Sequence, residues 1–334
     1  MTTLNHWATG RATSVDYEKM RLISRILNMH FIEQKNQSDI SKMLDMSSAK
    51  VNRIIRDARD KGYLEINIKT PFQNLFELER QLTDATGLPE AVICPSYSDD
   101  EDTALRTVGQ AAADYLVNQL RDSDVVTISG GKAIAEIVNA LRADRSYNVT
   151  VVPATGGVQG KHYTDVNHLA TRLAEKLGGK ALQIHAPLFA DSASERNMLM
   201  QMRQTREVLD MARHANIALM GVGSIVPESS SYFDLRLMSR EERDKLVGEG
   251  AVGDLLAHLF DTDGRPCGHE HNEKLVGLTI KELRDLPLTI GVAATSEKVN
   301  PIIGALRGRF FKTLITDEGT TAQVMDLYQK GETA

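Results

Sequence analysis

The sequence predicts a small, mostly helical N-terminal domain followed by a larger α/β domain with a mainly parallel sheet. The chain has 334 residues, which is more than one ordinary domain needs and fits one small and one large domain. Before residue 70, apolar residues recur at helical spacing, whereas from Glu90 onward short apolar runs alternate with helical stretches. Short apolar strands that alternate with helices are typical of a parallel sheet covered on both faces.

The composition is that of a soluble globular protein. No apolar run approaches the length needed to span a membrane, and the first residues contain no apolar core of an export signal. Cys94 and Cys267 are the only cysteines, so the sequence suggests no disulfide framework and is consistent with the cytoplasm.

Three helices are expected in the N-terminal domain, after a polar arm at residues 1–14. The first runs from Val15 to His30, the second from Ser38 to Leu44 and the third from Ser48 to Lys61, with Gly62 as its stop. The residues expected to face the core are Tyr17, Met20, Ile23, Leu27 and Phe31 in the first helix and Ile40, Met43 and Leu44 in the second.

The third helix divides by chemistry into an apolar stripe and a basic face. Val51, Ile54, Ile55 and Ala58 recur at helical spacing, and Ser47 is a plausible N-cap. A short basic helix with one apolar face is typical of the helix that a helix-turn-helix places in the DNA major groove. The expected DNA-contacting residues are Ser47, Ser48, Lys50, Asn52, Arg53 and Arg56.

Charge is distributed unevenly between the two domains. Residues 1–70 hold 12 Lys and Arg and 8 Asp and Glu, a net charge of +4, so the remainder of the −6 chain carries −10. The basic excess therefore lies with the predicted DNA-binding domain, and a modest +4 favours an oligomer that combines several weak sites.

A strand and a connecting helix follow the third helix. Tyr63 to Lys69 alternates apolar and polar residues, which makes the N-terminal domain a winged helix-turn-helix over residues 15–70. The segment 71–89 is expected to be a linker helix that runs from Asn74 to Thr86 and stops at Gly87.

The remaining chain, residues 90–334, is expected to be the α/β domain. Its strand candidates are Ala91–Cys94, Val125–Ser129, Val149–Pro153, Ala181–His185, Ile217–Gly221, Thr289–Ala293 and Thr313–Thr316. Helices are expected at Thr103–Leu120, Ile134–Leu141, Asn167–Leu177 and Pro301–Leu306. In such sheets, ligands bind beyond the carboxyl ends of the strands.

Three of these strands end in glycine-rich turns. They are Ser129-Gly130-Gly131-Lys132, Thr155-Gly156-Gly157 and Gly221-Val222-Gly223-Ser224. Glycine allows a backbone to approach a ligand closely, and the free amides of a following helix attract anions. Three such turns favour a pocket for a phosphate or a polyhydroxylated ligand. The alternative is that the glycines only make tight turns. No nucleotide-binding fingerprint is present.

Other chemistry receives less support from the sequence. Cys267, His269 and His271 form a short cluster without the second ligand pair that structural zinc needs, so neither a metal nor a cofactor is expected. A metal-sensing regulator remains an alternative, as does a polar surface loop. No nucleophile motif and no assembled acid–base pair is evident, so no catalytic residue is assigned.

The whole chain resembles the SorC/DeoR-type sugar-binding transcriptional regulators of bacteria. The resemblance rests on SSAKVNRIIRDARDKGYLEINI, VVPATGGVQG, HAPLFADSASERNMLM, DMARHANIALMGVGSI, GAVGDLLAHLFDTDGRP, GVAATSEKVNPIIGALRG and LITDEGTTAQVM, in this order. It implies an effector domain like those of sugar-phosphate isomerases and CoA transferases. It also implies a homotetramer on operator DNA, and a sugar, polyol or sugar phosphate effector that changes DNA affinity.

Site residues are transferred from the resemblance one by one. Thr155, Gly156 and Gly157 match the family's ligand-binding loop, Ser129 to Lys132 match a phosphate-facing loop, and Lys298 matches a lysine that contacts the effector. Asp191 and His258 lie where family members line the pocket. The first loop departs from the family pattern, since SGGKAI stands where W-G-x-T is usual. A sugar-phosphate isomerase is the rival function, because the fold is shared with enzymes.

Overall fold

The computed structural model describes residues 14–64, 72–98, 100–158, 165–226 and 238–331. The chain divides into two compact units, residues 1–70 and 71–334, which are described separately. Most of the expected arm at residues 1–14 and of the expected strand from Tyr63 to Lys69 lies outside the described residues.

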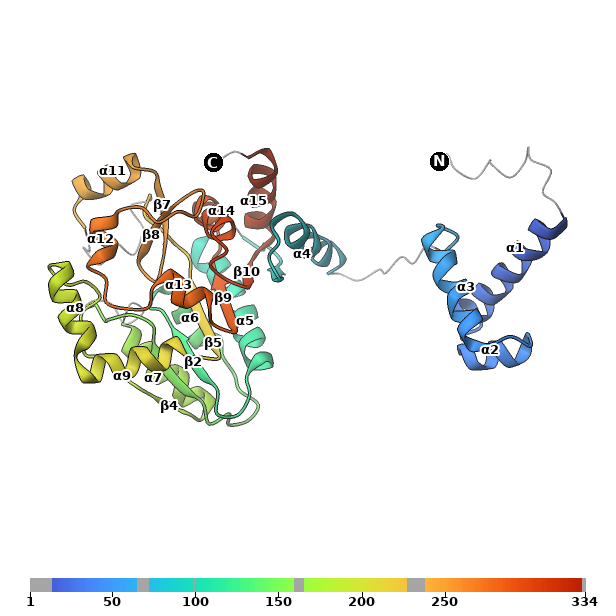
Figure 1. Ribbon diagram of the computed structural model, residues 1–334, viewed down its shortest axis with the longest axis horizontal. Coiled ribbons are helices and arrows are strands. Elements are labelled where there is room, and N and C mark those ends of the chain that lie inside the picture. Colours follow the sequence, from blue (N-terminus) through green and yellow to red (C-terminus); the bar gives the residue numbers. More distant parts are fainter. Residues whose placement is uncertain (1–13, 65–71, 99, 159–164, 227–237, 332–334) are drawn as a thin grey trace. The chain divides into compact units, whose positions relative to one another are not determined.

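Helices make up the described part of the N-terminal unit (Figure 1). Helix α1, Ser14–Leu27, continues into a π-helical turn at Asn28–Ile32 and is followed by α2, Gln37–Met43, and α3, Ser48–Asp60. A small core joins the three helices, and its buried members are Ile26, Met29, Ile40, Val51 and Ile55. The predicted end of α3 is confirmed, since Gly62 takes a left-handed φ of 70°.

The predicted core face of the first helix was only partly right. Leu27 packs against the small core, but Tyr17 is 64% exposed and Phe31 36% exposed, whereas Ile26 and Met29 are buried. The π-helical turn breaks the 3.6-residue spacing on which the prediction relied. In the second helix, Met43 is 55% exposed and was likewise assigned to the wrong face.

The larger unit is built on a seven-stranded parallel sheet in the order β1-β10-β9-β5-β2-β3-β4. The strands are β1 Glu90–Cys94, β2 Val125–Ile128, β3 Thr150–Pro153, β4 Lys180–Ala181, β5 Ile217–Gly221, β9 Leu288–Val292 and β10 Thr313–Asp317. Six of the seven predicted strands are confirmed, whereas the predicted strand Ala181–His185 overlaps β4 only at Ala181. Residues on both faces of β9 and β10 are buried, as expected for a covered parallel sheet.

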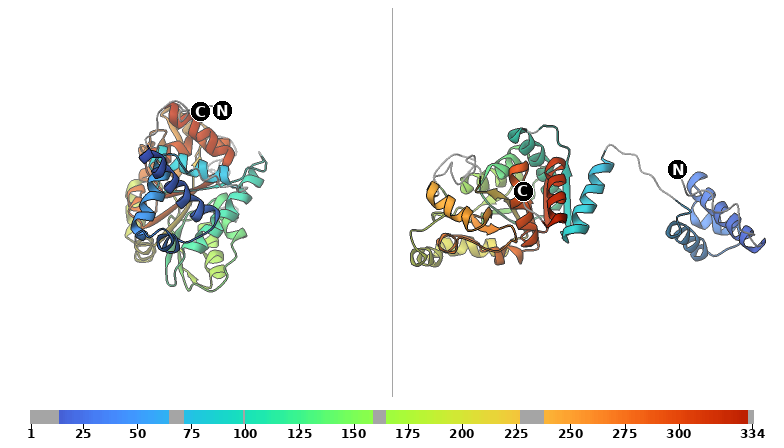
Figure 2. Two further views of the ribbon diagram at one scale, coloured as in Figure 1. Left: turned by 90° about the vertical axis from the view of Figure 1, so that its right-hand side faces the viewer. Right: turned by 90° about the horizontal axis from the view of Figure 1, so that it is seen from above.

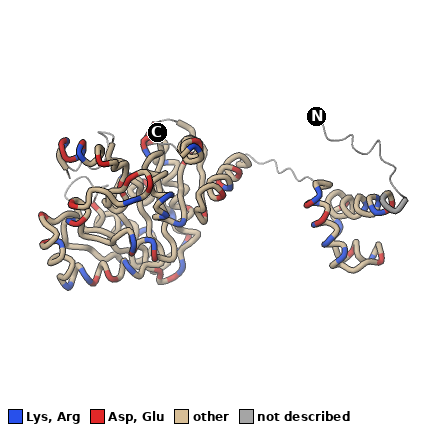
Figure 3. Tube along the Cα trace, turned by 45° about the horizontal axis from the view of Figure 1, so that its top comes forward, with Lys and Arg blue, Asp and Glu red and all other residues tan. Residues whose placement is uncertain are grey.

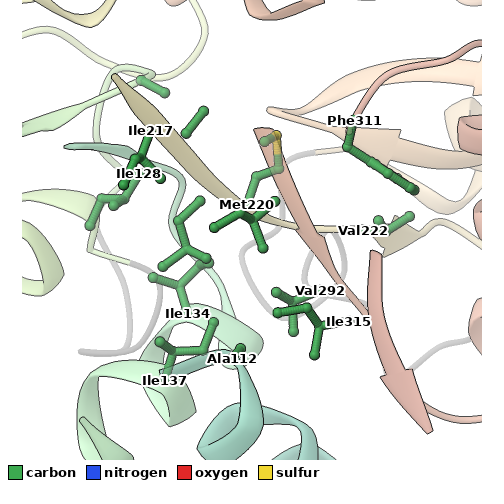
Figure 4. Packing of buried hydrophobic residues seen from close by; sticks show 14 of the residues in the cluster. Ala112, Ile128, Ile134, Ile137, Ile217, Met220, Val222, Val292, Phe311 and Ile315 are labelled. Atoms are coloured by element: carbon green, nitrogen blue, oxygen red, sulfur yellow. The ribbon is translucent and has the colours of Figure 1, made fainter. Parts of the chain in front are cut away.

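Helices cover this sheet and enclose its core. Helix α5, Glu101–Gln119, packs on α6, Lys132–Ala140, which packs in turn on α7, Val166–Leu177. In the described part of this unit, the other helices of nine or more residues are α4 Gln73–Thr86, α8 Ala193–Gln201, α9 Arg203–Arg213, α11 Arg240–Gly248, α14 Val299–Arg307 and α15 Glu318–Lys330. Figure 4 shows Ile128, Ile217 and Met220 of the sheet packed with Ile134 and Ile137 of α6.

A second sheet, two short helices and a 3-10 turn complete the described part of the unit. The second sheet, missed by the sequence analysis, has the order β6-β7-β8, with β6 Gly223–Ser224, β7 Ala251–Leu255 and β8 His258–Asp261. The short helices are α12 His269–Glu273 and α13 Ile280–Arg284, and a 3-10 turn, η2, spans Ser296–Lys298. The antiparallel strands were missed because two of them flank a turn without the glycine or asparagine that marks a hairpin.

The predicted connecting helix belongs to the larger unit. Helix α4 ends at Gly87, whose φ is 71°, as predicted. It packs against β1 and α15, and Figure 2 shows α4 and α15 side by side. Glu79 of α4 accepts a hydrogen bond from the Ile93 amide of β1 at 2.9 Å, so α4 covers an edge strand whose outer amides would otherwise be unpaired.

Candidate functional site

A cavity of about 150 Å³ opens at the carboxyl ends of the central strands. From β2 the chain builds outward to β3 and β4 and then returns to place β5 on the other side of β2. This reversal of strand order leaves a crevice between the loops that follow β2 and β5, which is where ligands bind in open α/β sheets. The cavity is lined by Ser129, Gly130, Gly131, Lys132, Thr155, Gly156, Gly221, Gly223, Ser224, Asp254, Lys298 and apolar neighbours.

The first glycine loop forms a site suited to an anion. Gly131 has a φ of 119° and is the N-cap of α6, where no side chain accepts a hydrogen bond from the first amides of the helix. These amides, together with the positive end of the helix dipole, lie at the first glycine loop, which lines the cavity. Lys132 adds a cation, and its Nζ lies 3.7 Å from an oxygen of Glu101 at the start of α5. Both side chains are about one-third exposed, so this ion pair is weak and exchangeable.

The second glycine loop is occupied by structural contacts. The Gly156 amide donates to the Val276 carbonyl at 2.8 Å, and the Gly157 amide donates to the Ala186 carbonyl at 2.9 Å. A Cβ at Gly156 would stand 2.1 Å from the Pro187 carbonyl oxygen. Close packing against distant segments therefore explains the glycine at 156, and the loop contributes Thr155 and Gly156 to the cavity lining.

A partly buried acid and a partly buried lysine also line the cavity, near enough for each to affect the pKa of the other. Asp254 lies near the end of β7 and Lys298 at the end of η2, and both line the cavity. Burial raises the pKa of Asp254 to about 6, while the Lys298 charge and the Ala257 amide oppose this shift. Burial lowers the pKa of Lys298, and Asp254 opposes that change. The pair thus offers an acceptor and a donor in a weakly hydrated setting.

Asp254 also supports the turn between β7 and β8. This two-residue turn, Leu256-Ala257, has φ values of 51° and 64°, a left-handed conformation that non-glycine residues adopt at a cost. The Asp254 carboxylate accepts a hydrogen bond from the Ala257 amide, and both turn residues line the cavity. Asp254 was missed by the sequence analysis because a lone acidic residue inside an apolar run carries no spacing signal.

Three of the predicted ligand residues do not line the cavity. Gly157 faces a neighbouring hollow, and Asp191 is exposed beside α12. His258 Nε2 donates to the Leu278 carbonyl at 2.9 Å, and burial lowers the pKa of His258. Proximity along the sequence to pocket residues did not determine the direction in which these side chains point.

The metal-sensing alternative is not supported by the described residues. Within them, no group of three or more His, Cys, Asp or Glu side chains is placed to hold a metal ion. The His271 ring packs against the Phe189 ring at 4.4 Å, and burial raises the pKa of the Cys267 thiol to about 12. Nor does any helix in the described ranges have the length and apolar character needed to cross a bilayer.

The DNA-facing candidates lie on one exposed surface of α3. Lys50, Asn52, Arg53 and Arg56 are exposed, whereas Val51, Ile55 and Ala58 are buried against the other helices. The Ser47 side chain accepts from the Lys50 amide at 3.2 Å, which confirms the predicted N-cap. Ser48 is exposed, but its hydroxyl donates to Ser41 of α2 at 3.2 Å. Figure 3 shows Lys and Arg distributed along the helices of this unit.

A family model described as "Putative sugar-binding domain" matches residues 70–326. The chain belongs to this sugar-binding domain family. The deoxyribonucleoside regulator of Bacillus subtilis is 29% identical over 94% of this chain and 100% of its own length. The sorbitol operon regulator of Klebsiella pneumoniae is 28% identical over 91% of this chain and 97% of its own.

Solved structures lead to the same family. The crystal structure of the full-length sorbitol operon regulator SorC from Klebsiella pneumoniae has a TM-score of 0.71 and 27% identity, covering 92% of this chain and 98% of its own. These relatives are regulators of transcription, and none of them supports the isomerase alternative. The chain is a transcriptional regulator of the sugar-binding domain family rather than an enzyme.

Proposed function

We propose that this regulator binds operator DNA through α2 and α3 and senses a small sugar phosphate in the cavity of its larger unit. The observation that carries the proposal is the convergence of an uncapped helix N-terminus, Lys132 and the Asp254–Lys298 pair at the reversal point of the sheet. In the proposed division, residues 15–70 bind DNA, 71–89 connect the domains and 90–334 sense the effector.

The phosphate is assigned to the first glycine loop. Backbone amides at the start of α6 provide donors, and Lys132 provides charge. A bound phosphate competes with Glu101 for Lys132, which costs little because the ion pair is partly exposed. Ser129 and Gly130 form the rest of this end of the cavity.

The sugar hydroxyls are assigned to Asp254 and Lys298. The carboxylate of Asp254 is suited to accept from hydroxyl groups, and Lys298 is suited to donate to a hydroxyl or carbonyl oxygen. None of the described residues that line the cavity is aromatic.

A thermal-shift screen of sugars, polyols and their phosphates tests the effector site. A compound that binds the folded state raises the melting temperature with concentration by mass action. We expect a phosphorylated hit whose effect is lost in Lys132→Met and retained in Lys180→Met, which removes an exposed lysine outside the cavity. A response to unphosphorylated polyols alone would contradict the phosphate assignment.

The DNA-binding proposal is tested without a known operator. Duplexes selected from a random library serve as targets, and binding is measured as a function of salt. Replacing a base-reading arginine, Arg53 or Arg56, by alanine should cost about 1–3 kcal/mol and relax the selected sequence. Arg25→Ala removes the same charge from an exposed position on α1 and is the matched control. Unchanged binding in both α3 variants would remove the assignment.

The finer architecture is proposed from the family resemblance. A wing at Tyr63–Lys69, a likeness of the larger unit to isomerase and CoA-transferase folds, and a homotetramer on paired half-sites complete the proposal. A cytoplasmic location follows from the DNA target. Sedimentation analysis of the full chain with and without selected DNA tests the tetramer.

A further inference from the structure

Thr295 has two unusual features at the edge of the cavity. It lies between β9 and η2 with φ of 86° and ψ of 158°, a conformation that residues with a Cβ rarely adopt. Its hydroxyl oxygen is buried and has no hydrogen-bond partner among the described residues. Strain and an unpaired polar atom at one residue persist only where the surroundings hold them, and they often mark a functional element.

The start of α15 holds the Thr295 amide. The amide donates to Thr320 Oγ1 at 2.8 Å and to Asp317 Oδ2 at 3.2 Å. The other Asp317 oxygen accepts from the Thr320 amide and from the Ser96 hydroxyl, each at 2.9 Å. Burial works against ionisation, but these donors hold the pKa of Asp317 below its usual value. Asp317 is therefore a charged, firmly bonded anchor near neutral pH.

The carbonyl group of Thr295 is hydrogen-bonded to the segment that carries Lys298 into the cavity lining. The Lys298 amide donates to the Thr295 carbonyl at 3.0 Å and closes the η2 turn. A three-residue turn has little freedom to absorb a movement of the lysine. A change in the position of Lys298 therefore acts directly on the backbone of Thr295, whose amide is bonded to α15.

Helix α15 and strand β1 both lead from this point to α4. Helix α15 packs against η2 and against α4, as the views in Figure 2 also show for the two helices. Ser96 follows β1, and β1 is bonded to α4 through Ile93 and Glu79. Helix α4 is the first element of the larger unit and follows the N-terminal unit along the chain.

We propose that Thr295, Asp317 and Thr320 form a joint that transmits effector occupancy from Lys298 to α4. Effector binding at Lys298 favours one of two arrangements of the strained Thr295 backbone, and α15 and α4 shift with it. The inference rests on the proposed function, since it assumes that Lys298 contacts the effector. In this proposal the cavity and α4 are coupled through one element, the Thr295 backbone, which has two arrangements. An effector that binds one arrangement more tightly than the other shifts the balance between them.

Hydrogen–deuterium exchange of the full-length protein tests the joint without an identified effector. Lys298→Gln perturbs the cavity end of the joint directly. We expect it to change exchange in the first turns of α15 and in α4 by at least about threefold. Thr295→Gly relieves the strained φ. In that variant, Lys298→Gln should change the logarithm of the exchange rate in α4 by less than about half of the change it causes in the wild type.

Two further variants separate coupling from general stability. Thr320→Val removes the acceptor at 2.8 Å from the Thr295 amide and should reduce the response as Thr295→Gly does. Gln323→Ala removes a side-chain hydrogen bond within α15, to the Gly319 carbonyl, but no contact of the joint, so it should retain the response. Each variant is compared with and without Lys298→Gln, so a uniform change in stability caused by the variant itself cancels.

The outcomes distinguish this inference from the proposed function. If Lys298→Gln leaves α15 and α4 unchanged, or if Thr295→Gly preserves the full response, the joint is overturned. A separate exchange experiment with inorganic phosphate tests the proposed function. Slower exchange in the Ser129–Lys132 loop when phosphate is added supports the anion site. Absence of that protection contradicts the phosphate assignment, and the mutational arm still decides the joint.

Discussion

Asp254 and Gly223 stand so close that no side chain fits between them. A Cβ built on Gly223 would lie 1.8 Å from an Asp254 carboxylate oxygen. The two residues pair across β6 and β7, where Gly223 is registered with Asp254. The third glycine loop therefore serves to admit the cavity carboxylate, a role that its sequence alone did not indicate.

Gly223→Ala is expected to displace Asp254 and destabilise the protein. The new methyl group meets a carboxylate held by the Ala257 amide, so the unfolding free energy should fall by about 1–3 kcal/mol. Gly221→Ala is the matched control in the same loop, since its Cβ would lie 3.6 Å from the nearest atom. Urea unfolding measures both. Equal losses in the two variants would show that Asp254 does not occupy the described position.

The raised pKa of Asp254 should appear in the pH dependence of stability. The pKa of Asp254 in the folded protein, about 6, exceeds the ordinary aspartate pKa of 3.8, so the folded state favours the protonated acid. Stability from this group is fully present below pH 4 and is lost as pH rises through about 6. The difference in unfolding free energy between wild type and Asp254→Asn should therefore fall by up to about 3 kcal/mol across this range. A difference that is flat or rises with pH contradicts the assignment.

Relieving the turn beside Asp254 should stabilise the protein. Ala257 has a φ of 64°, which glycine adopts without steric cost. Ala257→Gly is expected to raise the unfolding free energy by about 1 kcal/mol, net of glycine's greater entropy in the unfolded chain. Ala251→Gly in β7 should instead lower it by about 0.5–1 kcal/mol. Thermal unfolding distinguishes the two, and destabilisation by Ala257→Gly would argue against strain in the turn.

The contact between α4 and β1 yields a fourth prediction. Glu79 accepts from the Ile93 amide of an edge strand, so Glu79→Ala leaves that amide without its partner and should cost about 1–2 kcal/mol. Glu79→Gln keeps an acceptor and should cost less. Glu77→Ala, two residues earlier in the same helix, removes only a solvent-screened ion pair with Arg80; it is the control and should cost clearly less than Glu79→Ala. Similar losses at Glu77 and Glu79 in chemical denaturation would count against the strand contact.

Local sequence signals were sufficient for the regular elements. The strand from Ile217 to Gly221 and the helix that ends at Gly87 were predicted because apolar runs and glycine stops act over a few residues. The core face of α1 was predicted only in part, because the choice between Tyr17 and Ile26 depends on the positions of Ile40 and Val51, which lie on other helices.

The sequence by itself determined the two-domain plan, the parallel sheet, the basic face of α3 and the first glycine loop, since each depends on spacing within one segment. Tertiary structure alone decided which polar groups share the cavity. Asp254 and Lys298 are 44 positions apart along the chain, and they meet because β7 and η2 are brought together over the sheet. It also removed Asp191 and His258 from the cavity, because the direction of a side chain is set by packing against distant elements rather than by its neighbours in sequence.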